Sequence, residues 1–563
     1  MADALSFLSA PSPEPLRFQT VGGLLDATVA RWPDRPALIV RHQGIRWSYA
    51  EFAAQVDELA RGLMAQGLER GERIGIWSPN NAEWVLTQFA TARAGLVLVN
   101  INPAYRLAEL EHALRKVGCR ALLLAGATKH SDYPGMVRTL VPELAAGAGG
   151  RIDSAAFPEL KLLVQLGAEP TPGFLPFAQL VAGGARIEPA ALAALQALLD
   201  PDDPINIQFT SGTTGAPKGA TLTHFNIVNN GFFVGAGMRL TPQDRLCIPV
   251  PLYHCFGMVL GVLAAVAHGA AMVFPGESFD PLQVLETVAA ERCTALHGVP
   301  TMFIAELEHP RFREFDLSAL RTGIMAGAPC PIAVLRRVVD EMHMREVTIC
   351  YGMTETSPVS FQSHVDDPLE KRVSTVGRVH PHVQVKVIDA AGRVVARGVA
   401  GEICTRGYSV MRGYWNDAAR TAEVVDAAGW MHTGDLGVID ADGFCNIVGR
   451  VKDLIIRGGE NVYPREIEEF LYRHPDVQDV AVVGVPDAKY GEEICAFIRL
   501  RDGARADDES VRAFCRGQIA HYKVPRYVHF VEAFPMTVTG KVQKYLLREL
   551  AEQQLGLRRE ATA

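Results

Sequence analysis

Short apolar runs alternate with longer amphipathic stretches from the N-terminal region to about residue 400. The runs at 73–77, 121–124 and 162–164 predict buried strands, and the pattern over 82–94 predicts a helix. Alternation of this kind is typical of α/β layers. The longest apolar passage, 257–267, is well short of the roughly 20 residues that cross a bilayer, so it predicts a buried helix.

The pattern changes twice toward the C-terminus. Between 383 and 448, short strands separated by Gly/Asp turns predict a small β-rich subdomain. Beyond about residue 450, the chain predicts a compact α+β domain. Its expected elements are a helix over 464–474 and strands over 477–485, 494–500 and 527–534. At the other end, residues 1–15 are rich in Ser and Pro and are expected to form a flexible tail.

Composition restricts the function classes. The 563 residues are 48% hydrophobic and 21% charged, as in a globular protein with more than one core. A net charge of −8 argues against a general nucleic-acid or anionic-membrane surface, so any affinity for phosphate has to be local. The ten cysteines contain no CxxC pair, which predicts neither a zinc site nor a disulfide framework. We therefore expect a reducing compartment, with the cytoplasm preferred over a mitochondrial matrix-like one.

The segment 210–219 combines hydroxyls, glycines and a lysine in one turn after an apolar run. Glycines let backbone N–H groups face an oxyanion, and the hydroxyls and ammonium add donors and charge, so the segment predicts a phosphate loop. It is not a Walker A loop, because Pro217 precedes Lys218 and Gly219 follows it. Taken alone, a surface turn between strands would also fit.

Four further segments carry candidate chemistry. In 351–356 an aromatic side chain could stack on a purine and a carboxylate could hold Mg²⁺. An acid in 433–436 could accept ribose hydroxyls beside the arginine of 449–453. Near the C-terminus, 537–541 places a lysine after a glycine. Each segment alone is equally compatible with a surface turn or a solvated lysine.

In order and spacing, these segments resemble the adenylate-forming superfamily of acyl-CoA synthetases, peptide-synthetase adenylation domains and luciferases. The resemblance covers nearly the whole chain, and the sequences of the motifs, including that of 457–464, are most similar to those of medium-chain fatty acyl-CoA synthetases. It implies a large N-terminal adenylation domain over 16–449, built from α/β layers and a distorted β-barrel subdomain. It also implies a hinge at 450–452 and a mobile α+β C-terminal domain over 453–563.

The resemblance further implies a two-step reaction that uses ATP, Mg²⁺ and CoA. A carboxylic acid and ATP form an acyl-adenylate and pyrophosphate, and the CoA thiol then displaces AMP. Tyr351 and residues 327–329 would enclose adenine, while Asp435 and Arg450 would hold the ribose. The residues expected to bind ATP are Thr210, Ser211, Gly212, Thr213, Thr214, Gly215, Ala216, Pro217, Lys218, Gly327, Ala328, Pro329, Tyr351, Asp435 and Arg450.

Catalytic roles follow from the same motif positions. Glu355 with Thr354 would serve Mg²⁺ and the α-phosphate, and Lys541 would bridge the acyl carboxylate and the α-phosphate. Lys452 would act as the hinge, and rotation would bring Gly458, Gly459 and Glu460 to the pantetheine tunnel. His254 would gate the carboxylate pocket, although a buried structural histidine also fits this position. The acyl pocket is expected to include His254, Phe256, Met258, Val299, Phe303 and Val359, which could equally be ordinary core residues.

Alternatives remain at this point. An aryl or other carboxylate CoA ligase, or an adenylating ligase that loads a carrier protein, would keep the same site residues. A catalytically silent nucleotide or acyl sensor is a different class, but a decayed site would be free to lose Lys218, Glu355, Asp435, Arg450 or Lys541, and all are present. The partner expectations are a homodimer and a lysine acetyltransferase and deacetylase acting on Lys541, whose charge acetylation would remove.

Overall fold

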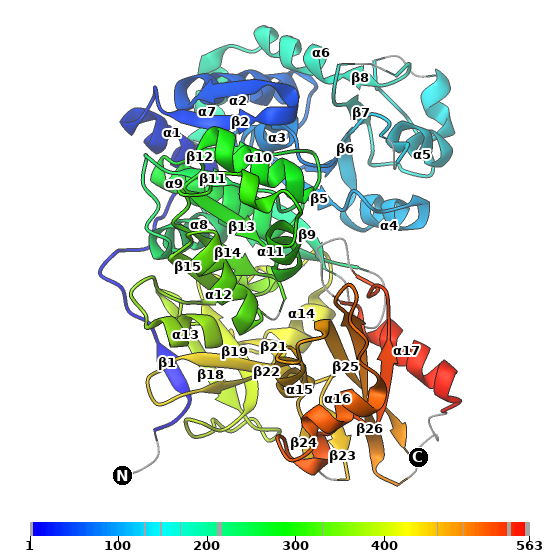
Figure 1. The fold of residues 1–563 in the computed structure, drawn as a ribbon. Helices are drawn as coiled ribbons and strands as arrows, with labels where there is room; N and C mark the ends of the chain where they lie inside the picture. The colour runs from blue at the N-terminus through cyan, green and yellow to red at the C-terminus, as the bar shows by residue number, and fades with distance from the viewer. Residues whose placement is uncertain are drawn as a thin grey trace.

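The computed structural model places a large N-terminal part above a small C-terminal domain (Figure 1). It describes residues 4–128, 131–146, 149–168, 171–210, 217–328, 330–458, 460–487, 489–536 and 542–557.

The first sheet lies in the upper part of the molecule as Figure 1 draws it. Its strands are β4 (Arg73–Trp77), β5 (Val97–Ile101), β6 (Cys119–Leu124), β7 (Leu162–Gln165), β8 (Leu175–Pro176), β9 (Pro204–Thr210), β10 (Lys218–Thr223) and β20 (Gly413–Tyr414). These eight strands follow the order β20-β10-β9-β5-β4-β6-β7-β8. The strands from β9 to β8 pair in parallel, whereas β10 pairs antiparallel with β9 and β20. The predicted strands at 73–77, 121–124 and 162–164 are confirmed.

A second sheet lies in the same N-terminal part of the molecule. Its strands are β2 (Pro36–Val40), β3 (Ile45–Ser48), β11 (Arg245–Cys247), β12 (Ala271–Phe274), β13 (Ala295–Gly298), β14 (Thr322–Ala326), β15 (Glu346–Gly352), β16 (Val359–Gln362) and β17 (Arg378–Val379). These nine strands follow the order β17-β16-β15-β14-β13-β11-β12-β2-β3. The central strands are parallel, so the segments that leave the carboxyl ends of β13, β14 and β15 gather at one edge of the sheet.

Helices cover both sheets and close the main core between them (Figure 1). They are α1 (Val21–Arg31), α2 (Tyr49–Ala65), α3 (Ala82–Arg93), α4 (Leu107–Val117), α5 (Tyr133–Leu140), α6 (Phe177–Ala182), α7 (Pro189–Gln196), α8 (His224–Gly237), α9 (Ala264–His268), α10 (Pro281–Glu291), α11 (Pro300–Leu307), α12 (Ile332–Glu341) and α13 (Leu369–Ser374). Local sequence sets their ends: the Ser48 hydroxyl accepts the Glu51 N–H at the start of α2, and the Glu51 carboxylate accepts the Ser48 N–H in return.

The apolar passage at 257–267 is a buried helix, as predicted. Residues Phe256–Leu263 form a π-helix that continues into α9, and every side chain of the π-helix is buried. This segment packs against α8 inside the main core. None of the helices in the described ranges is both long enough and apolar enough to cross a membrane.

The β-rich subdomain is an open antiparallel sheet. Its strands are β1 (Phe7–Ser9), β18 (Val383–Ile388), β19 (Gly401–Gly407), β21 (Met431–Ile439) and β22 (Cys445–Arg450), in that order, with α14 (Ala418–Val424) before β21. The expected distorted barrel does not close in the described part of the chain, because β1 and β22 end the pairing on either side.

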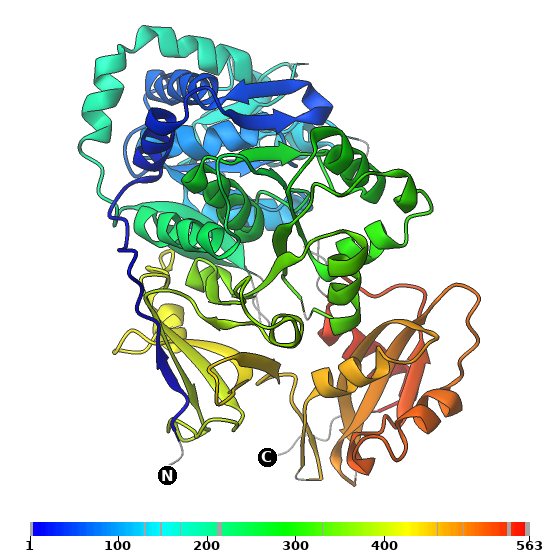
Figure 2. The same cartoon turned by 60° about the vertical axis from the view of Figure 1, so that its left-hand side comes forward.

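The expected tail at 1–15 also needs correction. Phe7–Ser9 pair with Gln384–Lys386, and the Ser6 hydroxyl donates to the Ala396 carbonyl at 3.0 Å. Figure 2 shows this N-terminal segment descending along the outside of the molecule to the sheet. Ser and Pro therefore predicted irregular backbone here, and long-range strand pairing overrode that local signal.

The C-terminal domain has its own sheet and cores. Its elements are β23 (Ile455–Arg457), β24 (Glu460–Val462), α15 (Pro464–Leu471), β25 (Val477–Asp487), β26 (Gly491–Leu500), α16 (Asp508–Cys515), β27 (Tyr527–Phe530) and α17 (Lys544–Leu555). The predicted helix and strands of this region are confirmed, with shifted ends. Polar contacts tie the domain to the N-terminal part: Arg465 donates to the Ile447 carbonyl at 2.9 Å, and Gln478 donates to Glu308 at 2.8 Å.

Candidate active site

The predicted phosphate loop connects β9 to β10 at the edge of the first sheet. Lys218 pairs directly with Thr210 across the two antiparallel strands, so the ends of the loop are fixed by sheet hydrogen bonding. The Pro217 carbonyl lies 3.1 Å from His112 Nε2. The residues between these ends, Ser211, Gly212, Thr213, Thr214, Gly215 and Ala216, lie outside the described residues.

Glu355 lies beside the two ends of this loop. It belongs to a short 3₁₀ turn, Thr354–Thr356, whose three side chains are buried. One oxygen, Oε1, accepts hydrogen bonds from the Tyr414 hydroxyl at 2.8 Å and from the Thr210 hydroxyl at 3.3 Å. The Lys218 ammonium lies 4.9 Å from the centre of the Tyr414 ring. The fold thus brings together a lysine, a carboxylate and a hydroxyl that the sequence predicted from separate motifs.

Tyr414 was missed by the sequence analysis. It lies on β20, which pairs with β10 and places the ring between Lys218 and Glu355. Burial, followed by the nearby charge of Glu355, raises the pKa of the Tyr414 hydroxyl, so the group remains a proton donor. The only signal in the sequence is an aromatic pair after a glycine, Gly413-Tyr414-Trp415, which indicates packing rather than chemistry.

A second group gathers around Asp435 on β21. The Tyr351 hydroxyl donates to Asp435 Oδ2 at 2.7 Å, and Arg450 Nε donates to Oδ1 at 3.1 Å. Asp435 and Arg450 are register partners across β21 and β22, while Tyr351 comes from β15 in the second sheet. Burial, followed by the charge of Asp435, raises the pKa of Tyr351 well above its ordinary value. A carboxylate between a phenol and a guanidinium can accept the two hydroxyls of a ribose.

The adenine segment follows β14, next to the end of β15. Ala326 pairs with Cys350, so residues 327 and 351 leave adjacent parallel strands at the same edge. Gly327 has φ +88, and a Cβ there would lie 3.1 Å from Val299 Cγ1, so only glycine fits without strain. Ala328 follows it half-buried, and Pro329 lies outside the described residues.

The turn that carries Asp435 is fixed by side chains from β19 and β21. Thr433 Oγ1 donates to the Ile403 carbonyl at 2.7 Å and accepts the Asp435 N–H at 3.1 Å. Glu402 Oε1 accepts the Gly434 N–H at 3.1 Å. Glu402 is a second residue to which the sequence analysis gave no role, although its short Gly401-Glu402-Ile403 motif is visible.

The apolar residues predicted for the acyl pocket are all buried. Phe256, Met258, Val299 and Val359 are buried in the main core, whereas Phe303 is fully buried in a separate core. Met258 Sδ accepts hydrogen bonds from the Asn100 and Gln208 amides at 3.2 and 3.1 Å. Whether these residues line an acyl pocket stays a prediction.

His254 lies just before the π-helix, half-buried. Its Nδ1 accepts the Phe256 N–H at 3.2 Å, and its carbonyl accepts the Met258 N–H at 3.1 Å. These contacts fix the imidazole at the start of the buried helix. Whether it gates a carboxylate pocket stays a prediction.

The predicted hinge residue Lys452 and the predicted tunnel residue Gly458 lie in turns. Lys452 is exposed in a turn in which the Asp453 and Leu454 N–H groups donate to the Arg450 carbonyl. Gly458 has φ +60, and its N–H donates to the Tyr490 carbonyl at 2.7 Å. Glu460 is exposed at the start of β24, while Gly459 and Lys541 lie outside the described residues. The predicted meeting of Lys541 with the ATP site therefore stays a prediction.

Comparison with known proteins identifies the family. Residues 25–415 match the family described as AMP-binding enzyme, and residues 466–541 match the AMP-binding enzyme C-terminal domain. The chain therefore belongs to the AMP-binding enzyme family.

Individual relatives extend over nearly the whole length. The putative acyl-CoA synthetase YngI of Bacillus subtilis (strain 168) is 49% identical, with 96% of this chain and 98% of that protein covered. The mitochondrial medium-chain acyl-CoA ligase ACSF2 of Danio rerio is 47% identical, with 98% and 91% covered.

Solved structures agree with the fold. The anthranilate CoA ligase AuaEII in complex with anthranoyl-AMP superposes with a TM-score of 0.85 at 25% identity, covering 97% of this chain and 99% of that one. ATP-bound MatB from Rhodopseudomonas palustris gives a TM-score of 0.81 at 30% identity, covering 95% and 99%.

Proposed function

We propose that this protein is an AMP-forming acyl-CoA ligase that joins a medium-chain fatty acid to CoA at the expense of ATP. The observation that carries the proposal is the pairing of two prebuilt polar groups: Lys218, Tyr414 and Glu355 beside the loop ends, and Tyr351, Asp435 and Arg450 on the nucleoside side. The first group suits a polyphosphate with its metal, and the second suits a ribose. The names of YngI and ACSF2 support the acid–CoA ligase class and, for ACSF2, the chain length.

The residues present fit Mg²⁺. Glu355 is a buried carboxylate beside a lysine, and oxygen ligands of this kind are the ones that Mg²⁺ prefers together with substrate phosphates. Glu355, assisted by Thr354, would hold the ion, which supplies positive charge where the phosphates carry negative charge. The Tyr414 and Thr210 hydroxyls orient the carboxylate before ATP arrives.

In the first step, an oxygen of the acid attacks the α-phosphorus, and the bond from that phosphorus to the bridging oxygen breaks. Pyrophosphate leaves with the bonding electrons. Negative charge approaches negative charge, so the protein has to place cations where charge builds up; Lys218 and Lys541 are the proposed cations. Asp435 and Arg450 hold the ribose so that the α-phosphate is in line.

In the second step, the CoA sulfur attacks the acyl carbon, AMP leaves, and the thiol proton passes to solvent. The mixed anhydride is already activated, so the chain needs no nucleophile of its own. We propose that Lys452 is the hinge about which the C-terminal domain turns, taking Lys541 away and bringing Gly458, Gly459 and Glu460 to the thiol. The exposed turn at Lys452 and the tight backbone at Gly458 support this assignment.

The test measures pyrophosphate release with ATP, Mg²⁺ and a panel of straight-chain, branched and aromatic acids, each with and without CoA. Each buried CH₂ contributes about 0.8 kcal/mol, so rates should rise with chain length until the pocket ends. We expect CoA-dependent turnover that peaks at medium straight chains. A peak at aromatic acids would keep the ligase class and reject the fatty acid. Pyrophosphate release that CoA fails to accelerate would indicate a carrier-protein acceptor, and binding of ATP without release would indicate a sensor.

Regulation and assembly add finer proposals. Acetylation of Lys541 would remove its charge and stop adenylation, while thioester formation from supplied acyl-adenylate would continue. Acetyl-Lys541 protein that adenylates at the full rate would contradict this.

A homodimer is proposed as the assembly, to be tested by measuring the molecular mass in solution. All ten cysteines are free, buried thiols, which supports a reducing compartment, with the cytoplasm preferred.

A further inference from the structure

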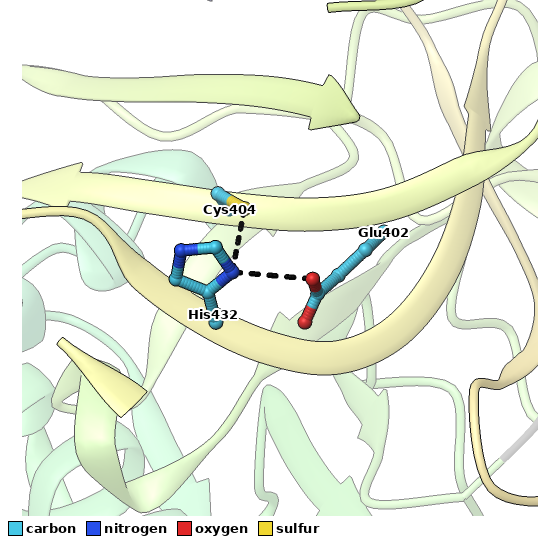
Figure 3. Close-up of side chains that lie close together, drawn as sticks. All are labelled: Glu402, Cys404 and His432. Atoms are coloured by element: carbon cyan, nitrogen blue, oxygen red, sulfur yellow. Dashed lines mark hydrogen bonds and ion pairs between the residues drawn. The ribbon is translucent and has the colours of Figure 1, made fainter. Parts of the chain in front are cut away.

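Three potential metal ligands lie together on one face of the β19–β21 strand pair (Figure 3). Cys404 and His432 are direct register partners across the two antiparallel strands. Glu402 is two residues before Cys404 on the same strand, so its side chain shares that face. The three ligand atoms lie within 4.8 Å of one another.

The distances between the ligand atoms suit one tetrahedral ion. His432 Nδ1 lies 3.1 Å from Glu402 Oε2 and 3.6 Å from Cys404 Sγ. With bonds of about 2.0 Å to nitrogen and oxygen and about 2.3 Å to sulfur, tetrahedral zinc holds such donors about 3.3–3.6 Å apart. The third distance, between Cys404 Sγ and the Glu402 carboxylate, is at most 4.8 Å, so the side chains would close around the ion on binding.

The surroundings orient each ligand. The other oxygen of Glu402, Oε1, already accepts the Gly434 N–H, which leaves Oε2 facing His432. The second ring nitrogen of His432 faces Asp426 Oδ2 at 3.9 Å, the arrangement in which a carboxylate supports a metal-bound histidine. Cys404 packs in a small apolar cluster with Ile388 and Trp430, which provides a low-dielectric side to the site.

The charges around the three ligands also favour a cation. Glu402, Asp426 and a Cys404 thiolate would contribute three negative charges. Lys386, the register partner of Cys404 on β18, and Arg406 lie over the Trp430 ring and contribute positive charge nearby. A divalent cation would neutralise the thiolate that forms when Cys404 binds it.

We propose that Glu402, Cys404 and His432 form a binding site for a divalent transition-metal ion of the zinc class, with a water as the fourth ligand. The site is separate from the Mg²⁺ position at Glu355, and it does not depend on the proposed ligase activity. The cysteine spacing predicted no zinc site, because that argument considers cysteines in pairs along the chain. Here the ligands come from two strands that only the fold brings together.

The competing interpretation is an ordinary Glu402–His432 ion pair with a buried cysteine beside it. The two interpretations differ in the sulfur: only a metal site forms a thiolate–metal bond. Cobalt(II) reports that bond, because it substitutes for zinc and a thiolate ligand gives an intense charge-transfer absorption in the near ultraviolet.

The test titrates chelator-treated full-length protein with Co²⁺ in excess Mg²⁺ and without ATP. We expect a charge-transfer band that saturates at one equivalent and disappears when Zn²⁺ is added. Cys404→Ser should abolish the band. His432→Asn, whose amide can still donate to Glu402 in place of Nδ1, should lower the cobalt affinity at least tenfold. Cys445→Ser, at a buried cysteine on β22 of the same sheet, is the matched control and should keep the band.

Two results would overturn the site: no band in the unmodified protein at excess cobalt, or a band that survives Cys404→Ser. Far-ultraviolet circular dichroism checks that each variant is folded. If Cys404→Ser does not fold, the His432→Asn titration decides, because affinity equal to that of the unmodified protein contradicts ligation by His432. Since the readout is a metal–sulfur bond, failure here leaves the ligase proposal intact, and inactivity toward all acids leaves this site intact.

Discussion

The hydroxyl of Tyr414 donates a 2.8 Å hydrogen bond to Glu355, and the same ring lies 4.9 Å from the Lys218 ammonium. One aromatic side chain thus stands between an anion and a cation. In the described ranges, no ion pair joins Lys218 to Glu355. This arrangement agrees with the proposed roles, in which the lysine binds phosphate and the carboxylate binds Mg²⁺.

Replacing Tyr414 with phenylalanine tests this relationship. Tyr414→Phe keeps the ring beside Lys218 and removes the donor to Glu355. A hydrogen bond to a charged group contributes about 1.5–3 kcal/mol, so we expect kcat/KM for MgATP to fall about tenfold or more. Pyrophosphate release measured over a range of Mg²⁺ concentrations checks it. Tyr414→Leu, which removes the ring as well, should be slower again, and a rate unchanged in Tyr414→Phe would show that the bond has no role in catalysis.

Asp435 provides a second test, on the nucleoside side. Asp435→Asn keeps the shape but removes the charge that faces Tyr351 and Arg450 and that we propose binds the ribose. Ribose binding is the same in the ground and transition states, so KM for ATP should rise about tenfold with little change in kcat. The control is ATP that lacks the ribose hydroxyls: it should be a poor substrate for the unmodified enzyme but lose little further with Asp435→Asn. If Asp435→Asn lowered activity with this ATP analogue as much as with ATP itself, Asp435 would not bind the ribose hydroxyls.

Much of the fold could be predicted from local pattern. The strand at 73–77 and the helix at 82–94 match β4 and α3 within a residue, because buried parallel strands and capped helices carry strong local signals. The pairing of Phe7–Ser9 with β18 could not be predicted in the same way. That strand is stabilised by a partner more than 370 residues away, and nothing in its own three residues indicates that partner.

The candidate site also contains some residues that the sequence motifs indicate and others that only the fold reveals. The motifs predict Lys218, Glu355 and Asp435 as site residues because only certain residue types suit the chemistry, and their roles stay predictions. Tyr414 and Glu402 act by holding those residues, and their positions follow from strand pairing rather than from motif chemistry. The acyl pocket stays a prediction: an apolar side chain that lines a pocket and one that fills a core look the same in sequence, and the apolar candidates, Phe303 included, are buried.

Lys541 should be required for the first step alone. By analogy with removing one preorganised transition-state donor, Lys541→Ala should lower the rate of adenylation by roughly 10²–10³, or about 3–4 kcal/mol. Thioester formation from supplied acyl-adenylate should be nearly unaffected. Single-turnover measurements of both half-reactions check this. Lys523→Ala, which removes a lysine paired with Glu466 in the same domain, is the matched control. An unchanged rate of pyrophosphate release in Lys541→Ala would contradict the proposed role of Lys541.

The C-terminal domain depends on a buried ion pair. Arg457 donates to both oxygens of Glu493, at 2.9 and 2.7 Å, and Glu493 is fully buried. Arg457→Ala would leave that carboxylate unpaired except for Arg526 at 3.7 Å, so we expect about 3–5 kcal/mol of destabilisation. Hydrogen exchange of the β26 amides in the full chain measures it locally. Adding Glu493→Gln to Arg457→Ala should recover part of the loss, and a double variant as unstable as the single one would contradict a charge effect.

Acid should destabilise the N-terminal domain through buried neutral histidines. His224 is buried, its Nδ1 accepts the Val21 N–H at 3.1 Å, and burial lowers its pKa to about 4. The same cause lowers the pKa of His297 to about 4 and that of His380 to about 3. An unfolded histidine has a pKa of about 6.5. Between these values the unfolded chain binds a proton that the native chain does not, so the free energy of unfolding falls as pH drops from about 6.5 toward 4. For His224 alone the full change is about 3 kcal/mol.

Urea unfolding at a series of pH values measures how steeply the free energy of unfolding depends on pH. His224→Gln, whose amide oxygen can still accept the Val21 N–H, should flatten that dependence in this window. If the variant kept the slope of the unmodified protein, His224 would not be a source of the acid sensitivity, and His380→Gln would then test the next buried imidazole in the same way.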